Sequence, residues 1–291
     1  MKPYALSQPS TLQQASAQIA ADGADALPLG GGTALMLMMK TGVLAPAELV
    51  NLRQTEPQWR RIELQPQGDL HIGALVTLSE LEHEPAVRQA VPALVQAMKR
   101  LSNVRVRNVA TVGGNLAHAD PHMDLPPLLC ALGAHVLVIH GPQQRQIPVE
   151  DLITGYYETS LQRGELIAKL VVPAQQQRRN AYVKITTRAA DDWPTIGIGI
   201  SLDIESGVIR SSALFVGAAT DRPTRLQAAE QILAGRQPSE ALFEQASEAA
   251  AAALSLRGDE RGSASYKKQL LQVHLRRALL ALAVDAEGTA R

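Results

Sequence analysis

Three consecutive glycines separate a short apolar stretch from a run of leucine and methionine in residues 27–40, LPLGGGTALMLMMK. The residues before the glycines, ALPL, predict a short buried strand, and TALMLMMK predicts a short helix. Glycine has no Cβ to hold a ligand away, and a helix N-terminus carries a partial positive charge, so such a loop suits an anion such as phosphate. The same pattern also makes an ordinary turn. Its spacing fits neither G-x-G-x-x-G nor G-x-x-x-x-G-K-S/T, so it predicts neither a Rossmann fold nor a P-loop.

A second glycine loop lies in residues 111–124, TVGGNLAHADPHMD, and it again precedes a predicted helix. It supplies a hydroxyl, two glycines and an asparagine. A dinucleotide has a pyrophosphate that needs several N–H donors and a ribose that needs an acceptor such as a carboxylate. The two loops together therefore favour a dinucleotide ligand more strongly than either loop does by itself.

Composition restricts the other classes of partner. The chain has 28 basic and 28 acidic residues, a balance that argues against nucleic acid or an anionic membrane as the main partner. The single cysteine, Cys130, cannot build a disulfide framework or a thiolate-held zinc or iron–sulfur site, and its apolar helical context predicts an inert thiol. No apolar run reaches about 18 residues, and the N-terminus lacks a signal-peptide pattern. We therefore expect a cytoplasmic protein without a membrane span.

The chain length and a polar connector predict two domains. The connector is QQQRRN, residues 175–180. After it, three strand-like stretches with short turns predict an antiparallel meander, and helices follow them, so the second domain is α+β. Before it, Ser10 is the expected N-cap of the first helix, and residues 102–124 are expected to be a long irregular segment.

The pair LPLGGGTALMLMMK and ATVGGNLAHADPHMDLPP resembles the FAD-binding medium subunits of the xanthine dehydrogenase and carbon monoxide dehydrogenase family of molybdenum hydroxylases. The spacing of the loops and the later stretches GELIAKLVVP and AYVKITTRAADD also match, so the resemblance covers nearly the whole chain. It implies an α+β fold. Residues 1–175 would be a FAD-binding domain of the vanillyl-alcohol-oxidase (PCMH) type, with subdomains of about 1–55 and 56–175. Residues 176–291 would be a small α+β domain of the carbon monoxide dehydrogenase flavoprotein type, with a three-stranded antiparallel sheet and helices.

The resemblance also assigns cofactor contacts. FAD would lie between the subdomains, with both glycine loops on its pyrophosphate. The first phosphate loop would consist of Pro28, Leu29, Gly30, Gly31, Gly32, Thr33, Ala34 and Leu35, and the second of Thr111, Gly113, Gly114 and Asn115. The Thr111 hydroxyl would contact a phosphate and Asp124 the cofactor's sugar. The resemblance further places Ile167 against the isoalloxazine ring, Lys184 near the ring's polar edge, and Leu101 along the adenine half.

Some of these residues also have simpler explanations. The cluster HADPHMD, residues 118–124, invites a metal site, but we expect a hydrogen-bonded loop with His122 exposed. The Leu35–Met39 run is expected to be core, since methionine fills irregular gaps. Arg105 and Arg107 are expected in surface or structural ion pairs rather than on phosphate. On strand periodicity alone, Lys184 would face solvent.

Trp193-Pro194 departs from the family pattern. Its role is open among lining the flavin ring, contacting a partner subunit and covering the sheet edge.

The resemblance implies an electron-transfer subunit of a heterotrimeric molybdenum hydroxylase. FAD in this chain would take electrons from 2Fe–2S clusters of a small subunit, after substrate oxidation at the molybdopterin of a large subunit, and pass them to an external acceptor. The assembly would be a dimer of heterotrimers. Two alternatives are a stand-alone FAD-dependent reductase or oxidase, similar to UDP-N-acetylenolpyruvoylglucosamine reductase, and a structural subunit that has lost its flavin.

Overall fold

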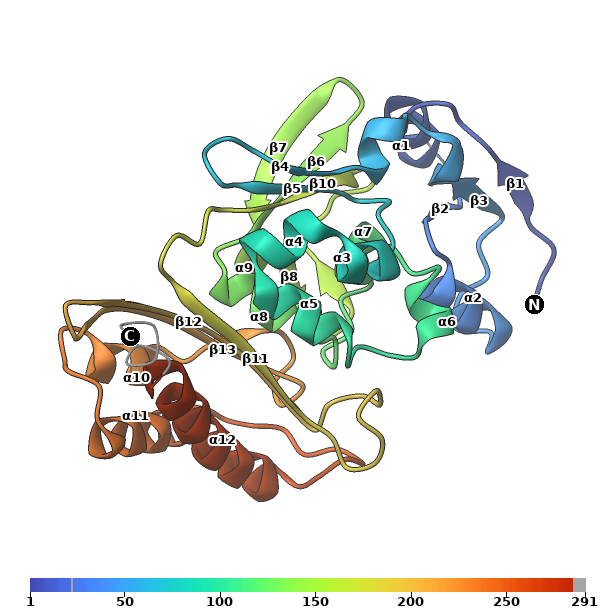
Figure 1. The fold of residues 1–291 in the computed structure, drawn as a ribbon. Coiled ribbons are helices and arrows are strands. Elements are labelled where there is room, and N and C mark those ends of the chain that lie inside the picture. Colours follow the sequence, from blue (N-terminus) through green and yellow to red (C-terminus); the bar gives the residue numbers. More distant parts are fainter. Residues whose placement is uncertain (22, 285–291) are drawn as a thin grey trace.

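The computed structural model describes residues 1–21 and 23–284, and it contains three units, each built around a sheet (Figure 1). The N-terminal unit comprises residues up to 60, the central unit residues 62–172, and the C-terminal unit residues 179–284. Within these described residues, none of the helices has both the length and the apolar character needed to cross a membrane.

The N-terminal unit has a parallel three-stranded sheet in the order β1-β3-β2. Its elements are β1 (Ala5–Ser7), α1 (Leu12–Ala20), β2 (Ala26–Leu29), α2 (Thr33–Lys40), β3 (Glu48–Asn51), η1 (Leu52–Gln54) and η2 (Pro57–Arg60). Helix α1 begins one residue later than predicted, because the extended Thr11 accepts from the backbone N–H of Gln14 and is the N-cap. The hydroxyl of Ser10 instead donates to the Gln14 side chain.

The central unit has an antiparallel five-stranded sheet in the order β4-β5-β10-β6-β7. Its strands are β4 (Ile62–Leu64), β5 (Leu70–Gly73), β6 (His135–His140), β7 (Gln143–Pro148) and β10 (Leu166–Val172), with a small hairpin of β8 (Ile153–Gly155) and β9 (Glu158–Thr159). Its helices are α3 (Leu78–His83), α4 (Pro85–Ala90), α5 (Pro92–Met98), α6 (Val104–Arg107), α7 (Val112–His118), α8 (Leu125–Ala131) and α9 (Val149–Leu152). The prolines of α4 and α5 occupy the first turn, where the missing N–H interrupts no helical hydrogen bond.

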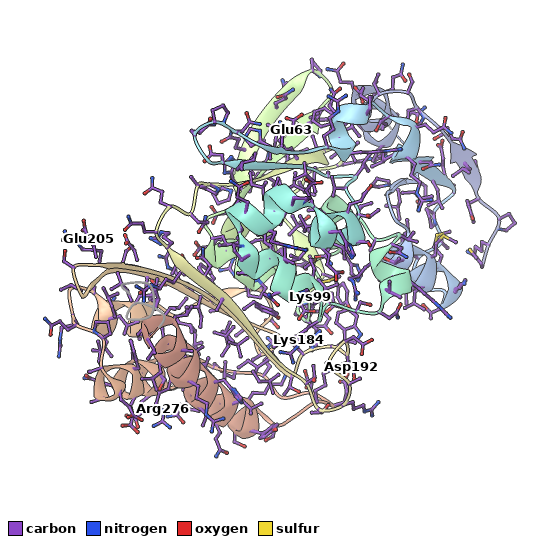
Figure 2. The ribbon with its side chains drawn as sticks, viewed as in Figure 1. Glu63, Lys99, Lys184, Asp192, Glu205 and Arg276 are labelled. Carbon is purple, nitrogen blue, oxygen red and sulfur yellow. The ribbon has the colours of Figure 1, made fainter. Side chains whose placement is uncertain are left out.

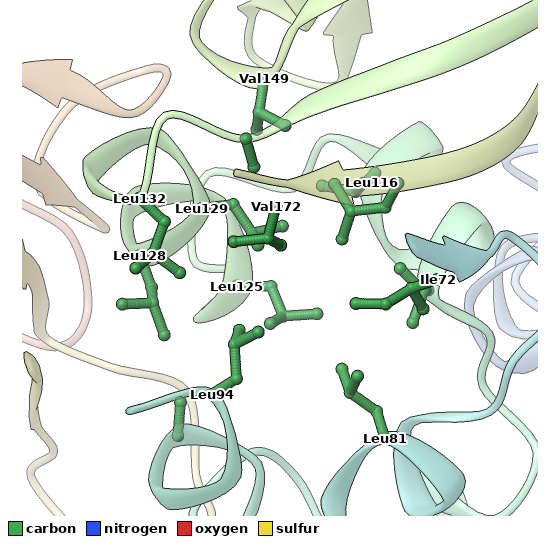
Figure 3. Close-up of a cluster of buried hydrophobic side chains, with 14 of the residues drawn as sticks. Ile72, Leu81, Leu94, Leu116, Leu125, Leu128, Leu129, Leu132, Val149 and Val172 are labelled. Atoms are coloured by element: carbon green, nitrogen blue, oxygen red, sulfur yellow. The ribbon is translucent and has the colours of Figure 1, made fainter. Parts of the chain in front are cut away.

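The main hydrophobic core lies between this sheet and its helices. Figure 3 shows its centre, where leucines of α8 meet Leu94 of α5, Ile72 of β5 and Val172 of β10. The strand β10 is almost wholly apolar, LIAKLVV, and it occupies the middle of the sheet. A strand with apolar residues on both faces is stable there because both faces are covered.

The segment 102–124 is more regular than expected, because it contains α6 and α7. Asn103 caps α6 by accepting from Val106 N–H, and Thr111 caps α7 by accepting from Gly114 N–H. These caps stabilise short helices that hydrophobic periodicity does not reveal. Gly113 and Gly114 therefore lie in the first turn of a helix rather than in a free loop.

The C-terminal unit confirms the predicted α+β fold, with a meander followed by helices. Its elements are β11 (Arg179–Ile185), β12 (Ile196–Glu205), β13 (Val208–Gly217), β14 (Thr224–Arg225), α10 (Gln227–Leu233), α11 (Glu240–Ala253) and α12 (Ala264–Val284). The sheet has four strands instead of three, because β14 pairs with the end of β13. Arg225 of β14 is held by Glu230, whose carboxylate accepts from its Nε at 2.9 Å.

The two faces of the C-terminal sheet have different neighbours (Figure 1). The isoleucines of the β12 sequence IGIGIS, together with Leu214 and Val216, pack with α10, α11 and α12 in a separate core. The opposite face carries the glycines of β12 and Phe215, and it packs against α8 of the central unit. A Cβ added to Gly199 would lie 2.1 Å from the Pro127 carbonyl oxygen, so the lack of a side chain permits this contact.

We predict that Gly199→Ala weakens the junction between α8 and the C-terminal sheet. The new methyl group meets rigid backbone, so the unfolding free energy should fall by about 1–3 kcal/mol. Gly217→Ala is the matched control, because its Cβ would lie 3.1 Å from a ring carbon of the same Pro127 and needs only a small shift. Urea unfolding of both variants measures the difference, and equal losses would contradict this account.

Candidate functional site

The two glycine loops lie against each other. A Cβ added to Gly31 would lie 2.2 Å from the carbonyl oxygen of Val109, and one added to Gly30 would lie 2.9 Å from the Thr111 hydroxyl oxygen. Real Cβ atoms do not approach backbone that closely, so only glycine allows this contact at Gly31. The sequence predicted two loops acting together, and the structure brings them into direct contact.

The first loop has free backbone donors. In the part of the chain that the structure describes, no acceptor is found for the N–H groups of residues 30–35. Gly32 has φ of 77° and is the N-cap of α2, so these N–H groups precede or begin the helix. Arg53 donates to the carbonyl oxygens of Gly30 and Gly31 at 3.2 and 3.4 Å, which ties down the acceptor side of the loop and adds a positive charge. Such a set of N–H groups suits an anion.

The second loop differs from the expectation. Its glycines already donate within the protein, Gly113 N–H to Ala74 O at 2.8 Å and Gly114 N–H to the Thr111 hydroxyl at 3.2 Å. This loop therefore offers side chains and not backbone donors. The Thr111 hydroxyl keeps its own proton to donate, and the buried Oδ1 of Asn115 has no partner within the described residues. A buried polar atom without a partner costs free energy unless a ligand or water satisfies it, so the loop fits a polar ligand.

Asp124 lies at the junction of the central and C-terminal units. It directly precedes α8, but its backbone is already helical and its carboxylate makes no capping bond. The carboxylate instead accepts from the Tyr182 hydroxyl at 2.8 Å and from Lys184 Nζ at 3.0 Å. Lys184 also donates to the Arg100 carbonyl oxygen at 2.7 Å. Figure 2 shows Lys184 on the side of its sheet that faces the central unit.

This ion pair is buried, with side-chain exposures of 1% for Lys184 and 7% for Asp124. Burial raises the pKa of the Asp124 carboxyl, and the charge of Lys184 opposes that rise. Burial and the neighbouring carboxylate raise the pKa of Tyr182 well above its ordinary value, so its hydroxyl keeps its proton and donates. Strand periodicity alone predicted that Lys184 faces solvent. That prediction is wrong, because α5 and α8 cover this face of the sheet.

The other residues that were predicted to contact the cofactor lie in the main core or on α2. Leu101 and Ile167 are buried in the main core, and Ile167 lies beside an irregularity in the pairing of β10 with β6. Of the Leu35–Met39 run, only Met39 is buried, and Leu37 is 62% exposed. The expectation that this run is core is therefore wrong for Leu37, because α2 packs only one side against the protein. The predicted roles of these residues toward a cofactor stay predictions.

The segment 118–124 forms a hydrogen-bonded loop, as expected. His122 was expected to be exposed, but its ring lies between Asp120 and Asp259, with Nδ1–Oδ1 and Nε2–Oδ2 distances of 3.2 and 2.9 Å. Trp193 lies edge-on to this ring, with centroids 6.1 Å apart. Within the described residues, no group of three or more histidine, cysteine or acidic side chains is placed to hold a metal ion.

Two further expectations concern single side chains. Arg107 is in a structural ion pair, with its Nε 2.9 Å from Glu82, as predicted. Cys130 is buried, and burial raises the pKa of its thiol, so it is inert.

Sequence reasoning missed two residues of this region, Arg53 and Tyr182. Arg53 lies in η1, two residues after the end of β3, and the parallel pairing of β2 with β3 brings it to the first glycine loop. Tyr182 precedes Lys184 by two residues and so shares its face of β11. The strand alternation is the one signal in the sequence that pairs Tyr182 with Lys184.

Comparison with known families and proteins finds likeness over nearly the whole chain. Residues 2–175 match the family described as "FAD binding domain in molybdopterin dehydrogenase", and residues 181–282 match "CO dehydrogenase flavoprotein C-terminal domain". The carbon monoxide dehydrogenase medium chain of Hydrogenophaga pseudoflava is 30% identical over 93% of this chain and 94% of its own length. The nicotine 6-hydroxylase medium subunit of Paenarthrobacter nicotinovorans is 30% identical over 94% of each chain.

Solved structures show the same likeness over nearly the whole chain. A chain of quinoline 2-oxidoreductase from Pseudomonas putida 86 superposes with a TM-score of 0.91 at 28% identity, covering 98% of this chain and 99% of that one. A chain of the H. pseudoflava carbon monoxide dehydrogenase gives 0.91 at 30% identity, covering 97% and 98%. UDP-N-acetylenolpyruvylglucosamine reductase from Thermus caldophilus reaches a TM-score of only 0.33, which carries no argument for the stand-alone reductase alternative.

We predict that Lys184→Met destabilises the protein by about 3–5 kcal/mol, because it leaves the Asp124 carboxylate buried without its counter-charge. The double variant Asp124→Asn/Lys184→Met should recover most of that loss, since it removes both charges. Arg210→Met is the control, because its ion pair with Glu205 is exposed and is worth about 1 kcal/mol or less. Urea unfolding gives all three values, and equal losses in the single and double variants would contradict the pairing.

Proposed function

Because the chain belongs to the family of FAD-binding medium subunits of molybdenum hydroxylases, which includes the xanthine and carbon monoxide dehydrogenases, we propose that it is the electron-transfer subunit of such an oxidoreductase. It would receive electrons from 2Fe–2S clusters of a small partner subunit and pass them to an external acceptor. The observation that carries the proposal is the contact of the two glycine loops. Among the described residues, the N–H groups of the first loop and the Asn115 oxygen of the second have no hydrogen-bond partner.

The residues present fit FAD. The free N–H groups of the first loop, at the start of α2, suit the pyrophosphate, and Arg53 adds a positive charge there. The Thr111 hydroxyl and the Asn115 amide supply polar groups from the facing loop. The family resemblance assigns Ile167 and Lys184 to the ring, Asp124 to the sugar and Leu101 to the adenine half. When bound, the flavin accepts electrons singly and releases one or two, while the protein positions it and excludes side reactions.

We further propose the organisation of chain and complex. The boundary between the FAD-binding and C-terminal domains lies at residues 175 and 176, with subdomains of about 1–55 and 56–175 in the first domain. Support comes from the family matches, which end at 175 and resume at 181, and from the separate sheets. Substrate oxidation would take place at the molybdopterin cofactor of a large partner subunit, in a dimer of heterotrimers. The cytoplasmic location stays a prediction.

We predict that the tagged chain, purified from its own cells, carries noncovalent FAD and brings down an iron–sulfur and a molybdenum subunit. Absorption near the flavin bands, iron and molybdenum analysis and mass spectrometry of the copurified chains measure this. A colourless chain with no partner would overturn the proposal and favour a structural role without flavin. A yellow chain that turns over substrate without partners would overturn it in favour of the stand-alone reductase.

We predict that Gly31→Ala lowers FAD occupancy of the purified complex by about tenfold or more, equivalent to at least 1.4 kcal/mol of binding free energy. The methyl group would meet the Val109 carbonyl oxygen at 2.2 Å and force the loops apart. Gly42→Ala is the control at the other end of α2. Its φ of 80° strains alanine, but an added Cβ would have no atom within 4 Å, so the variant tests backbone strain without a clash. The ratio of flavin to protein absorbance reports occupancy, and equal occupancy in both variants would exclude this placement of the cofactor.

A further inference from the structure

The ring of His122 joins two units of the protein through both of its nitrogens. Nδ1 lies 3.2 Å from Asp120 Oδ1 in its own loop, and Nε2 lies 2.9 Å from Asp259 Oδ2 in the C-terminal unit. The three side chains are largely buried, with exposures between 7% and 19%. The two residues joined across the units are 137 positions apart in the chain. His122 therefore holds the loop 118–124 against the segment that precedes α12.

The geometry determines the charge of this histidine. An ionised carboxylate only accepts hydrogen bonds, and a neutral imidazole has one N–H donor and one acceptor nitrogen. Neutral His122 could satisfy only one of its two carboxylate neighbours, and its other nitrogen would point a lone pair at a carboxylate oxygen. The imidazolium donates from both nitrogens and satisfies both neighbours. The arrangement therefore requires the protonated ring.

Other contacts hold both carboxylates in place and ionised. Asp120 accepts from the Tyr157 hydroxyl at 2.5 Å and from the His122 backbone N–H at 2.8 Å. Asp259 accepts from Lys267 Nζ at 2.6 Å and from the Arg261 backbone N–H at 2.8 Å. Lys267 is itself buried and donates to the Ala218 carbonyl oxygen, so it anchors Asp259 to the C-terminal core. Neither carboxylate is free to turn away from the ring.

We propose that the His122 imidazolium clamps the central unit to the C-terminal unit, and that the clamp opens when the ring loses its proton. The charged and titratable groups that face the ring are Asp120 and Tyr157 from the central unit, and Asp259, Arg261 and Lys267 from the C-terminal unit. The clamp lies two residues before Asp124, so it also positions the loop that carries the buried ion pair with Lys184. His122 is thus a positioning residue.

The direction of the pH dependence follows from these contacts. The hydrogen bond to Asp120 raises the pKa of His122 above 6.5, although burial opposes it. Burial by itself would raise the pKa of Asp259, but hydrogen bonds from Lys267 and His122 lower it to about 2. A raised histidine pKa gives docking free energy that is fully present below 6.5 and is lost as the pH rises through the pKa of the clamped ring. The clamp is therefore closed while the ring is protonated and opens as the pH rises above that pKa.

The test uses the full chain, with histidine labelled for NMR, titrated from mildly acidic to mildly alkaline pH. The His122 ring should titrate above 6.5, whereas the pKa of His118 in the same loop is lowered by burial and should fall below 6.5. The titration is measured on the wild-type chain. A His122 variant is needed only to identify which signal belongs to His122. A His122 ring that titrates below 6.5 would overturn the proposal.

Hydrogen exchange at the junction gives an independent result. In the wild-type chain, protection of the segments 118–124 and 257–263, corrected for intrinsic rates, should fall about tenfold between mildly acidic and alkaline pH, as expected for loss of a charge-assisted hydrogen bond. His122→Gln should show the low protection at every pH, because one amide cannot reach both carboxylates. His118→Gln is the matched control and should keep the wild-type profile. Protection that is unchanged by His122→Gln would overturn the clamp, and neither measurement depends on FAD or on a partner subunit.

Discussion

The contact between the Gly31 position and the Val109 carbonyl oxygen is the constraint on which the candidate site depends. Without a Cβ, the backbone of the first loop rests directly on that of the second, and no other residue type fits the 2.2 Å gap. Next to this contact, the N–H groups at the start of α2 have no acceptor among the residues that the structure describes. The neighbouring Gly30 lies beside the Thr111 hydroxyl, which caps the helix that carries Asn115. The candidate binding groups therefore come from the N-terminal and central units, which the absence of a side chain at Gly31 allows to approach each other.

The segment 118–124 connects this cradle to the C-terminal unit. It begins at the end of α7, whose first turn is the second glycine loop, and it ends at Asp124. Along it, His122 reaches Asp259 and Asp124 reaches Lys184, so two buried ionic contacts hold the units together. Buried charges are expensive unless paired, and breaking the Asp124–Lys184 pair leaves an uncompensated charge. The position of the C-terminal sheet is thus tied to the seven residues that end the second glycine loop.

Much of the local structure was predictable. The three long strands of the C-terminal sheet and the helices that follow them give local signals, and the structure confirms them. The failures have physical causes. Gly113 and Gly114 were expected to offer free N–H groups, but the cap by Thr111 and the pairing with Ala74 use them. Leu37 was expected in the core, but an apolar run does not say how much of a helix its neighbours cover.

The sequence by itself determined the long strands and most of the helices, the two glycine loops and the family to which the chain belongs, because these depend on residue type and spacing along the chain. Only the tertiary structure decided which polar side chains meet. Asp124 and Lys184 are 60 residues apart, and His122 and Asp259 are 137 apart. Periodicity states which face of an element a side chain occupies, but not what covers that face. That depends on how distant elements pack, and here the packing turned an apparent surface lysine and an apparent surface histidine into buried ionic contacts.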